Sequence, residues 1–391
     1  MLTLSSLYPN RDMPQHGIFV ENRLRRLLDS GEVASLVVAP VPWFPFDDRR
    51  FGRYGTFAGV PREERRHGIT VLHPRYALIP KIGMSSAPLL MYGSLRRCLE
   101  RVLQERFRFD LLDAHYFYPD GVAAVMLGRR LGKPVVITAR GTDINLISDY
   151  LLPRRWIRWA AARAAGIVAV SDALRARLIA LGIEASRIEV LRNGVDLELF
   201  APRDRAAARK ALGLDVDGTV VLSVGQLIPR KGHDLAMRAV ARLPEATLVI
   251  VGEGPEADGL RRLARRLGSA ERIRFLSAIP QERLATIYNA ADVLVLASSR
   301  EGLPNVVLEA LACGTPVVAT AVWGTPEIVA APAAGRLVEE GSPETLAGAI
   351  RDLLADPPAR AATRAYAERF GWGPTTAGQL RLFKSVLDRR D

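Results

Sequence analysis

Two cations in the second half of the chain stand where a phosphate could bind. The loop Val224–Gly232 follows an apolar run, contains Gly225 and ends in Arg230-Lys231-Gly232 as a helical pattern begins. Glycine allows the backbone to approach a ligand, and a helix N-terminus offers free N–H groups to a phosphate. Cations at this end oppose the helix dipole, which costs free energy unless an anion is present. The loop therefore predicts a phosphate site, although a solvated basic turn fits the residues equally well.

A second loop carries two carboxylates, Glu301 and Glu309, on either side of a helix start at Pro304. Glu309 lies about one and a half turns inside that helix. The pair could grip one ligand with two polyol parts, a sugar at Glu301 and a ribose at Glu309, with the N–H groups of Gly302 and Leu303 facing a diphosphate between them. The alternative is a surface Glu301 and a buried Glu309, which would require a polar partner.

Short apolar runs alternate with helical patterns along the whole chain. The runs are continuous, as expected for parallel strands buried on both faces, and the alternation indicates an α/β protein. The expected strands are Ser35–Pro40, Ile69–His73, Leu111–His115, Pro134–Thr138, Gly166–Val170, Ile188–Leu191, Thr219–Val224, Ala246–Val251, Arg272–Leu276, Val293–Leu296 and Pro316–Thr320. Met1 lies only a few residues before Leu7, so we expect a truncated first strand and leave the true start codon open.

The strand pattern restarts near residue 219, after a turn signal at Arg192–Asp196. We therefore expect an N-terminal domain over 1–196 and a C-terminal domain over 197–373. Both would be Rossmann-like, doubly wound domains that face each other across a cleft. Ligands bind outside the carboxyl ends of such sheets.

Composition limits the classes of function. The chain has 391 residues, 49% of them hydrophobic and 25% charged, which is the globular range. Its two cysteines, Cys98 and Cys313, indicate a reducing compartment without a disulfide framework. We expect neither a signal peptide nor a membrane-spanning helix, and hence a cytoplasmic protein.

The net charge of +12 is unevenly distributed. Residues 1–198 contain 29 Lys+Arg and 20 Asp+Glu, a balance of +9, which leaves +3 for the remainder. Such a field suits an anionic membrane face, an anionic substrate or a nucleic acid. A compositional bias towards arginine, with no partner at all, explains the charge as well.

The joint order of several further motifs resembles the retaining glycosyltransferases of family four, whose fold is called GT-B. The Glu-x7-Glu signature of that family matches Glu301 and Glu309. The flanking matches are Asn193-Gly194-Val195-Asp196, Val251-Gly252-Glu253-Gly254-Pro255, Tyr288-Asn289-Ala290-Ala291-Asp292, Cys313–Thr320 and Pro326-Glu327-Ile328-Val329. The resemblance covers nearly the whole chain. It implies a nucleotide-sugar site that includes Gly225, Gly252, Gly254, Gly302, Leu303, Asn305, Val306 and Glu309, and a last helix, 374–391, that packs back on the N-terminal domain.

The N-terminal half resembles a bacterial surface-polysaccharide branch of this family. The matching motifs are Tyr8-Pro9-Asn10, His16–Asn22 and Asp113-Ala114-His115. In that pattern Gly17 lies in the loop nearest the transferred sugar and phosphate. The loop that begins at Arg140 follows a strand and should reach the cleft, so we count Arg140 and His115 among the catalytic candidates.

Two positions depart from the family pattern. Many members have Gly-Arg-Leu where this chain has Gly225-Gln226-Leu227, which leaves Arg230 and Lys231 to bind the diphosphate. Many members also have a histidine at the position that Arg140 occupies in this chain. This chain therefore carries a permanent cation where those members carry a titratable imidazole. Arg140 could stabilise phosphate charge or hold an anionic acceptor.

Other signals are weaker. Asp215-Val216-Asp217 has the form of a metal-binding motif but precedes a strand beside Gly218, so we interpret it as a turn. We expect no metal and no cofactor, because the histidines are scattered. Two rivals remain: a nucleotide-sugar epimerase of the same fold and a basic nucleic-acid-binding protein. The second would need aromatics interleaved with Lys and Arg over an extended face, and we expect no nucleic-acid partner.

The resulting hypothesis is a retaining, metal-independent glycosyltransferase. It would move a sugar from a UDP-, GDP- or ADP-linked donor to a saccharide or lipid-linked acceptor, in bacterial polysaccharide or glycolipid synthesis. Arg230 and Lys231 would support the departing diphosphate, and Glu301 would position the sugar. The basic stretch Arg154–Trp159 and the apolar run Pro88–Tyr92 suggest peripheral contact with the anionic inner face of the cell membrane. The alternative for Arg154–Trp159, which its residues favour, is an amphipathic surface helix that docks onto its own domain.

Overall fold

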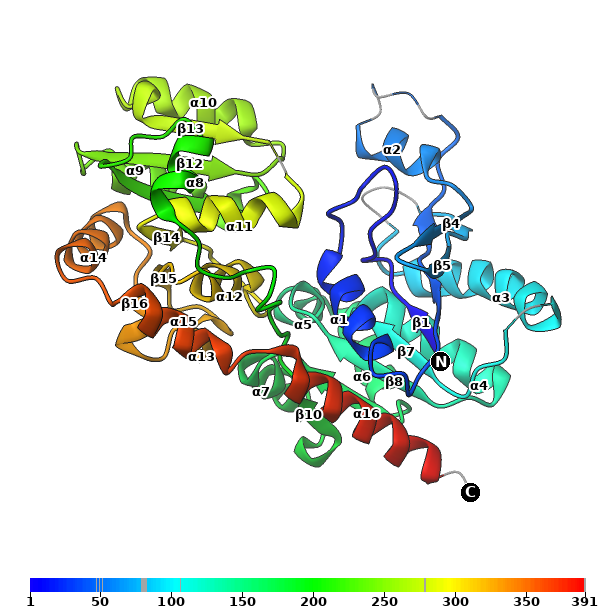
Figure 1. Ribbon diagram of the computed structural model, residues 1–391. Helices are drawn as coiled ribbons and strands as arrows, with labels where there is room; N and C mark the ends of the chain where they lie inside the picture. The colour runs from blue at the N-terminus through cyan, green and yellow to red at the C-terminus, as the bar shows by residue number, and fades with distance from the viewer. Residues whose placement is uncertain are drawn as a thin grey trace. The chain divides into compact units, whose positions relative to one another are not determined.

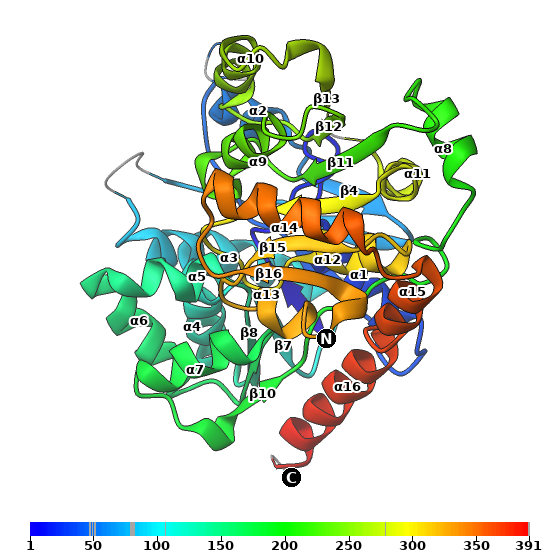
Figure 2. The ribbon, with the colours of Figure 1, turned by 90° about the vertical axis from the view of Figure 1, so that its left-hand side faces the viewer.

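The computed structural model describes residues 1–46, 48, 50, 52–78, 83–105, 107–277 and 279–389, without the side chains of 53 and 101–105. The chain divides into two compact units. Unit 1 comprises Met1–Arg192 and Gly373–Asp391, and unit 2 comprises Asn193–Trp372. Figures 1 and 2 show the elements of both units.

Unit 1 is built on a sheet with the strand order β10-β9-β8-β7-β1-β2-β5-β4 among the described residues. Neighbouring strands are parallel except β4 and β5. The strands are β1 (Leu2–Leu4), β2 (Leu36–Val38), β4 (Glu63–Arg66), β5 (Ile69–Leu72), β7 (Leu112–His115), β8 (Val135–Ala139), β9 (Gly166–Ala169) and β10 (Ile188–Val190), with a separate pair β3 (Val41–Pro42) and β6 (Arg75–Tyr76).

Helices flank this sheet. They are α1 (Ile18–Leu28), α2 (Arg53–Gly59), α3 (Ala87–Glu105), α4 (Val122–Leu131), α5 (Thr142–Asn145), α6 (Leu151–Ala161), α7 (Asp172–Ala180) and α16 (Trp372–Asp388). Residues Val20, Leu24 and Leu27 of α1 share a buried cluster with Leu382 and Phe383 of α16. The C-terminal helix therefore contributes to the core of unit 1.

Unit 2 has a parallel sheet with the order β13-β12-β11-β14-β15-β16. Its strands are β11 (Thr219–Val224), β12 (Ala246–Val251), β13 (Ile273–Leu276), β14 (Val293–Leu296), β15 (Val317–Thr320) and β16 (Gly335–Val338). Its helices are α8 (Arg205–Ala211), α9 (His233–Val240), α10 (Ala257–Arg266), α11 (Gln281–Ala290), α12 (Asn305–Ala312), α13 (Thr325–Ile328), α14 (Pro343–Ala355) and α15 (Arg360–Glu368). This is the strand order of a Rossmann fold.

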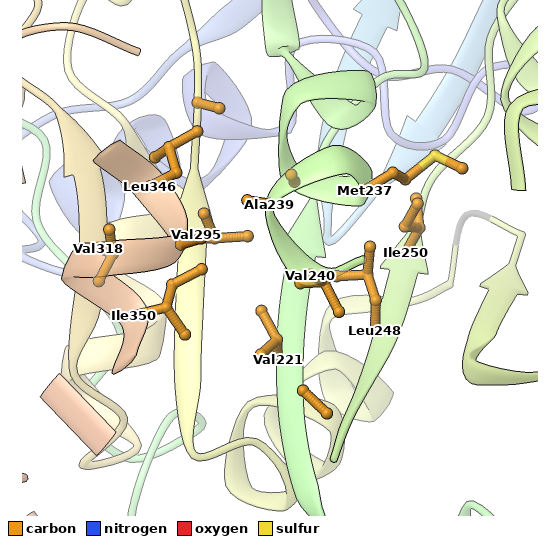
Figure 3. Close-up of a cluster of buried hydrophobic side chains, with 14 of the residues drawn as sticks. Val221, Met237, Ala239, Val240, Leu248, Ile250, Val295, Val318, Leu346 and Ile350 are labelled. Carbon is orange, nitrogen blue, oxygen red and sulfur yellow. The ribbon is translucent and has the colours of Figure 1, made fainter. Parts of the chain in front are cut away.

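Apolar side chains of α9 and α14 cover one face of the unit 2 sheet (Figure 3). Val240 from α9 and Ile350 from α14 pack with Leu248 of β12 and Val295 of β14, and all four are buried. The strands β12 and β13 are added on one side of β11, whereas β14, β15 and β16 are added on its other side. The direction in which successive strands are added to the sheet therefore reverses between β11 and β14. Loops that follow those two strands lie at the sheet position where doubly wound domains bind ligands.

The packing predicts a large cost for truncating a core residue of unit 2. Leu248→Ala should lower the free energy of unfolding by about 2–5 kcal/mol, because the lost contacts leave a cavity in a fully buried position. Val216→Ala, at a position that is 44% exposed, serves as the control and should change little. Urea unfolding of both variants tests this, and similar losses would contradict the assigned core.

Candidate functional site

The loops after β11 and β12 are joined through their backbones. The N–H of Leu227 donates to the carbonyl oxygen of Glu253 at 2.8 Å. Gly252 has a φ of +152°, and a Cβ there would lie 1.8 Å from the carbonyl oxygen of Gly225. A Cβ on Gly254 would lie 2.3 Å from the carbonyl oxygen of Leu227. Glycine at 252 and 254 thus allows two loops to touch, a structural reason that needs no ligand.

The loop after β11 also contacts the loop after β14. Gly232 adopts a φ of +65°, and a Cβ there would lie 2.0 Å from the carbonyl oxygen of Ala297. The N–H of Ser299 donates to the carbonyl oxygen of Arg230 at 2.9 Å. The basic turn at the start of α9 is therefore held against the loop that carries Glu301.

Glu301 forms ion pairs with both predicted cations. Lys231 Nζ lies 2.6 Å from Glu301 Oε1, and Arg230 Nη1 lies 3.7 Å from Oε2. Burial by itself raises the pKa of Glu301, but the charges of Lys231 and Arg230 outweigh it and leave that pKa below its usual value. The anion that the basic turn requires is therefore supplied within unit 2, and the two cations are not a solvated turn.

The start of α12 presents backbone donors beside this cluster. Gly302 and Leu303 precede the helix, Asn305 and Val306 open its first turn, and no side chain caps it. The Nδ2 of Asn193 donates to Asn305 Oδ1 at 3.1 Å, which fixes the direction of that side chain. Uncapped N–H groups at a helix start bind anions, and α12 begins at the carboxyl end of β14.

Glu309 is buried in α12 and has neutral partners. Tyr288 donates its hydroxyl hydrogen to Glu309 Oε2 at 2.7 Å, and Gln281 supplies a further hydrogen bond. Burial raises the pKa of Glu309 to about 7, although both hydrogen bonds act in the opposite direction. The partner that a buried Glu309 requires is thus Tyr288. The two carboxylates of the Glu-x7-Glu signature have pKa values that are pushed apart.

His233, at the start of α9, positions the loop and was not singled out from the sequence. Its Nδ1 lies 2.9 Å from Ser223 Oγ and its Nε2 lies 3.2 Å from the carbonyl oxygen of Gln226. Burial lowers the pKa of His233 to about 4, so the ring is neutral, with Nε2–H donating to Gln226. In the sequence, His233 could have been noticed because it directly follows Gly232, the glycine at the start of α9.

In unit 1, His115 and Arg140 are linked in a buried chain of hydrogen bonds. His115 Nε2 donates to Asp113 Oδ2 at 3.0 Å, and His115 Nδ1 accepts from the guanidinium of Arg140. Gln379 of α16 also donates to Asp113 Oδ2, at 3.0 Å. Burial, aided by Arg140, lowers the pKa of His115 to about 4 against the attraction of Asp113. The neutral His115 is therefore held in one tautomer by Asp113.

Asp143 orders the loop that carries Arg140. Its carboxylate accepts from the backbone N–H groups of Phe117 and Gly141, both at 2.7 Å, and of Arg140 at 3.2 Å. Gly17 lies at the start of α1 with a φ of +70°, and a Cβ there would lie 2.3 Å from the carbonyl of Leu7. The predicted site residues therefore form two groups, one in each unit.

Matches to known families and proteins agree with this geometry. Residues 204–370 match the family described as glycosyl transferases group 1, and residues 57–199 match glycosyltransferase family 4. The D-inositol 3-phosphate glycosyltransferase of Segniliparus rotundus is 36% identical over 318 residues, which cover 75% of this chain and 70% of the relative. The chain therefore belongs to the glycosyltransferase family of that relative, whose two family models it matches in its two halves.

Solved structures confirm the predicted GT-B fold of this glycosyltransferase. Sucrose-phosphate synthase from Thermosynechococcus elongatus has a TM-score of 0.79 and 22% identity over 99% of each chain. HepE from Anabaena, in complex with UDP-glucose, has a TM-score of 0.74 and 22% identity over 98% of this chain and 100% of its own. At these identities the likeness concerns the fold of two Rossmann-like domains.

Within the described part of the glycosyltransferase, no group of three or more His, Cys, Asp or Glu side chains is arranged to hold a metal ion. Asp215 Oδ1 accepts from the backbone N–H of Asp217 at 3.1 Å, the geometry of a turn. None of the described helices is long and apolar enough to cross a membrane.

The environment of Glu309 predicts a pH-dependent stability. A carboxyl with a raised pKa keeps its proton in the folded protein where the unfolded chain has lost it, so stability falls as the pH rises from about 4.5 to about 7. Glu309→Gln avoids a buried charge and should stabilise the free protein by about 1–3 kcal/mol at pH 8 and little at pH 5. Chemical unfolding at both pH values measures this. Equal effects at the two values would contradict the assigned burial.

Proposed function

We propose that this glycosyltransferase moves a hexosyl group from a nucleoside-diphosphate sugar to an acceptor hydroxyl. The observation that carries the proposal is the charged cluster in the loops after β11 and β14, the two neighbouring strands between which the direction of strand addition changes. There Lys231 and Arg230 are paired with Glu301 beside the uncapped start of α12. Cations and helix N–H groups suit a diphosphate, and carboxylates suit the hydroxyls of a sugar and a ribose.

The parts of the donor are assigned from this geometry. The diphosphate would lie against the first turn of α12, at Asn305 and Val306, with Lys231 as its cation. Glu309 would accept hydrogen bonds from the ribose, which favours the ionised carboxylate and lowers its pKa on binding. Glu301 would accept hydrogen bonds from the transferred sugar.

The chemistry proposed is electrostatic. The bond between the anomeric carbon and the phosphate oxygen breaks, a bond to the acceptor oxygen forms, and the acceptor proton passes to the released diphosphate or to solvent. Lys231 and Arg230 would stabilise the charge that develops on the diphosphate, so no metal ion is needed. Retention of configuration rests on the family resemblance, as do the assignments of His115 and Arg140 to the reaction centre.

The base and the acceptor receive different support. The HepE neighbour is in complex with UDP-glucose, and we therefore take a UDP-linked donor as the first to test among the UDP-, GDP- and ADP-linked ones. The acceptor we propose is a saccharide or a lipid-linked sugar of polysaccharide or glycolipid synthesis. The name of the Segniliparus relative points to a second candidate, D-inositol 3-phosphate.

Lys231→Ala should lower turnover about 10²–10³-fold, because a charge that acts on the developing transition state is removed. UDP release from UDP-glucose is measured with and without acceptor, in excess EDTA. Formation of an epimeric UDP-sugar without acceptor, detected by chromatography of the nucleotide sugars, would favour the rival epimerase. A complete loss of UDP release in EDTA that manganese restores would contradict metal independence. Lys210→Ala, an exposed lysine of unit 2, is the matched control.

A double variant separates chemistry from folding. Lys231→Ala also deprives the buried Glu301 of its nearest cation, which lowers stability. In Lys231→Ala/Glu301→Gln the uncompensated charge is gone, so stability should recover, while turnover should stay well below that of Glu301→Gln alone because the cation for the diphosphate is missing. If the double variant turned over as fast as Glu301→Gln, Lys231 would have only a structural role.

We also propose that the enzyme binds anionic membranes through α6. The N-terminal end of this helix exposes apolar side chains at Tyr150, Leu151 and Leu152, with Leu151 62% exposed. The cations of Arg155 and Arg158 are exposed on the same helix. Apolar contact together with arginine charge is the combination that binds an anionic bilayer surface.

The apolar run Pro88–Tyr92 contributes less to that surface than its composition suggests. Met91 is fully buried and Pro88 is buried, whereas Leu89 is exposed. Arg96, in the same helix, lies 3.8 Å from Glu100, which offsets its charge. The hydrophobic face of α3 is therefore mainly core.

The full chain should sediment with phosphatidylglycerol vesicles at low salt and be released at high salt, because each arginine near the surface adds about 1 kcal/mol and salt screens it. Leu151→Ser/Leu152→Ser should weaken this binding, and Val216→Ser, an exposed position in unit 2, should not. Equal binding to neutral phosphatidylcholine vesicles, or none to either lipid, would contradict the proposal.

A further inference from the structure

A cavity of about 320 Å³ lies within unit 1 and takes no part in the clusters described above. Aromatic rings of Tyr8, Tyr54, Phe57 and Tyr76 contribute to its walls. Its volume is at the lower end of the roughly 300–1,000 Å³ of small-molecule sites, which are mostly apolar with a few polar groups. The cavity is suited to a ligand of about one sugar ring.

The cavity opens where a doubly wound domain binds ligands. Ser6 follows β1, Ala39–Pro42 follow β2 and His73 follows β5, and all of these residues line the cavity. These strands are neighbouring and parallel, so the cavity lies at the carboxyl ends of the unit 1 sheet. His115 and Arg140, at the ends of β7 and β8, belong to the same edge.

The described walls of the cavity contain no Lys, Arg, Asp or Glu. The two histidines in the walls contact oxygens of the protein. His73 Nδ1 lies 3.0 Å from the carbonyl oxygen of Ala39, and its Nε2 lies 2.8 Å from Glu64 Oε1. His16 Nε2 lies 3.1 Å from the carbonyl oxygen of Ser6. His73 is already paired with the carboxylate of Glu64, so a phosphate in this cavity would lose its hydration without taking up that imidazole as its own counter-charge.

The aromatic walls favour a sugar ring. Tyr54 and Phe57 of α2 pack edge to face with centroids 6.2 Å apart, and Phe44 packs on Tyr54 at 5.5 Å. The face of an aromatic ring carries negative potential, which attracts the C–H groups of a pyranose. Asn10 and Ser6 are also in the walls, but Ser6 Oγ donates to Asp120 Oδ2 at 2.9 Å and Asn10 Oδ1 accepts from the backbone N–H groups of Asp12 and Met13, so the aromatic rings are the main contact offered to a sugar.

We propose that this cavity binds the acceptor and selects an uncharged pyranoside over a phosphorylated polyol such as D-inositol 3-phosphate. The inference rests on the proposed transfer function and names the acceptor class for it. It separates this chain from the activity named for the Segniliparus relative.

The test uses the full chain and measures binding of methyl glucopyranoside, octyl glucopyranoside and D-inositol 3-phosphate by saturation-transfer NMR, with UDP affinity from calorimetry. Phe57→Ala should weaken both pyranosides about five- to tenfold, because an aromatic contact worth about 1 kcal/mol is lost, and should leave UDP affinity unchanged. Phe46→Ala is the matched control, since it removes an exposed aromatic ring that packs on Phe44 and does not line the cavity.

Tighter binding of the octyl glycoside would identify a lipid-linked source of the sugar, and equal binding a free saccharide; both support an uncharged pyranoside. Equal losses in the two variants, or D-inositol 3-phosphate binding that is tighter than pyranoside binding and sensitive to Phe57→Ala, would overturn the inference. Failure to bind UDP would instead count against the proposed function.

Discussion

The ion pair between Lys231 and Glu301 is the interaction on which the unit 2 site depends. It joins residues that are seventy positions apart, and it forms because β11 and β14 are neighbours in the sheet. Gly232 permits the contact, since any side chain there would collide with the carbonyl of Ala297. The pair is polar and largely buried, so its geometry must be held by the backbone around it. The backbone contacts between the loops after β11, β12 and β14 provide that support.

The same site holds two carboxylates in opposite electrostatic states. Glu301 lies beside two cations and has a lowered pKa, whereas Glu309 contacts neutral donors and has a pKa of about 7. Environments that shift the pKa values of two carboxyl groups in opposite directions suit the two groups to different roles. In the proposed reaction, Glu301 is charged before the donor arrives. Glu309 reaches the same state when ribose hydroxyls replace some of the hydration it has lost.

Much of the architecture could be predicted from the sequence because buried parallel strands are continuous apolar runs. β11 and β12 have the predicted bounds. β1 was expected only as a truncated strand, yet its three residues lie in the centre of the unit 1 sheet, between β2 and β7. β16 begins at a glycine and contains Arg336, so it lacked the apolar signal. The partners of Glu301 and His115 depend on strand order, which local patterns do not contain.

Both units hold a buried cation against a polar group of their own. In unit 1 the guanidinium of Arg140 donates to neutral His115, whose tautomer Asp113 holds, and in unit 2 Lys231 donates to Glu301. In the proposed reaction, a cation that is already removed from water would not have to be dehydrated again when the diphosphate binds, so that cost would not offset the attraction. The arginine at position 140 fits this arrangement better than a second histidine would. Burial also lowers the pKa of Arg140 well below its usual value, against the attraction of Asp113 and Asp143, but a guanidinium starts from so high a pKa that it keeps its charge where an imidazole such as His115 loses it.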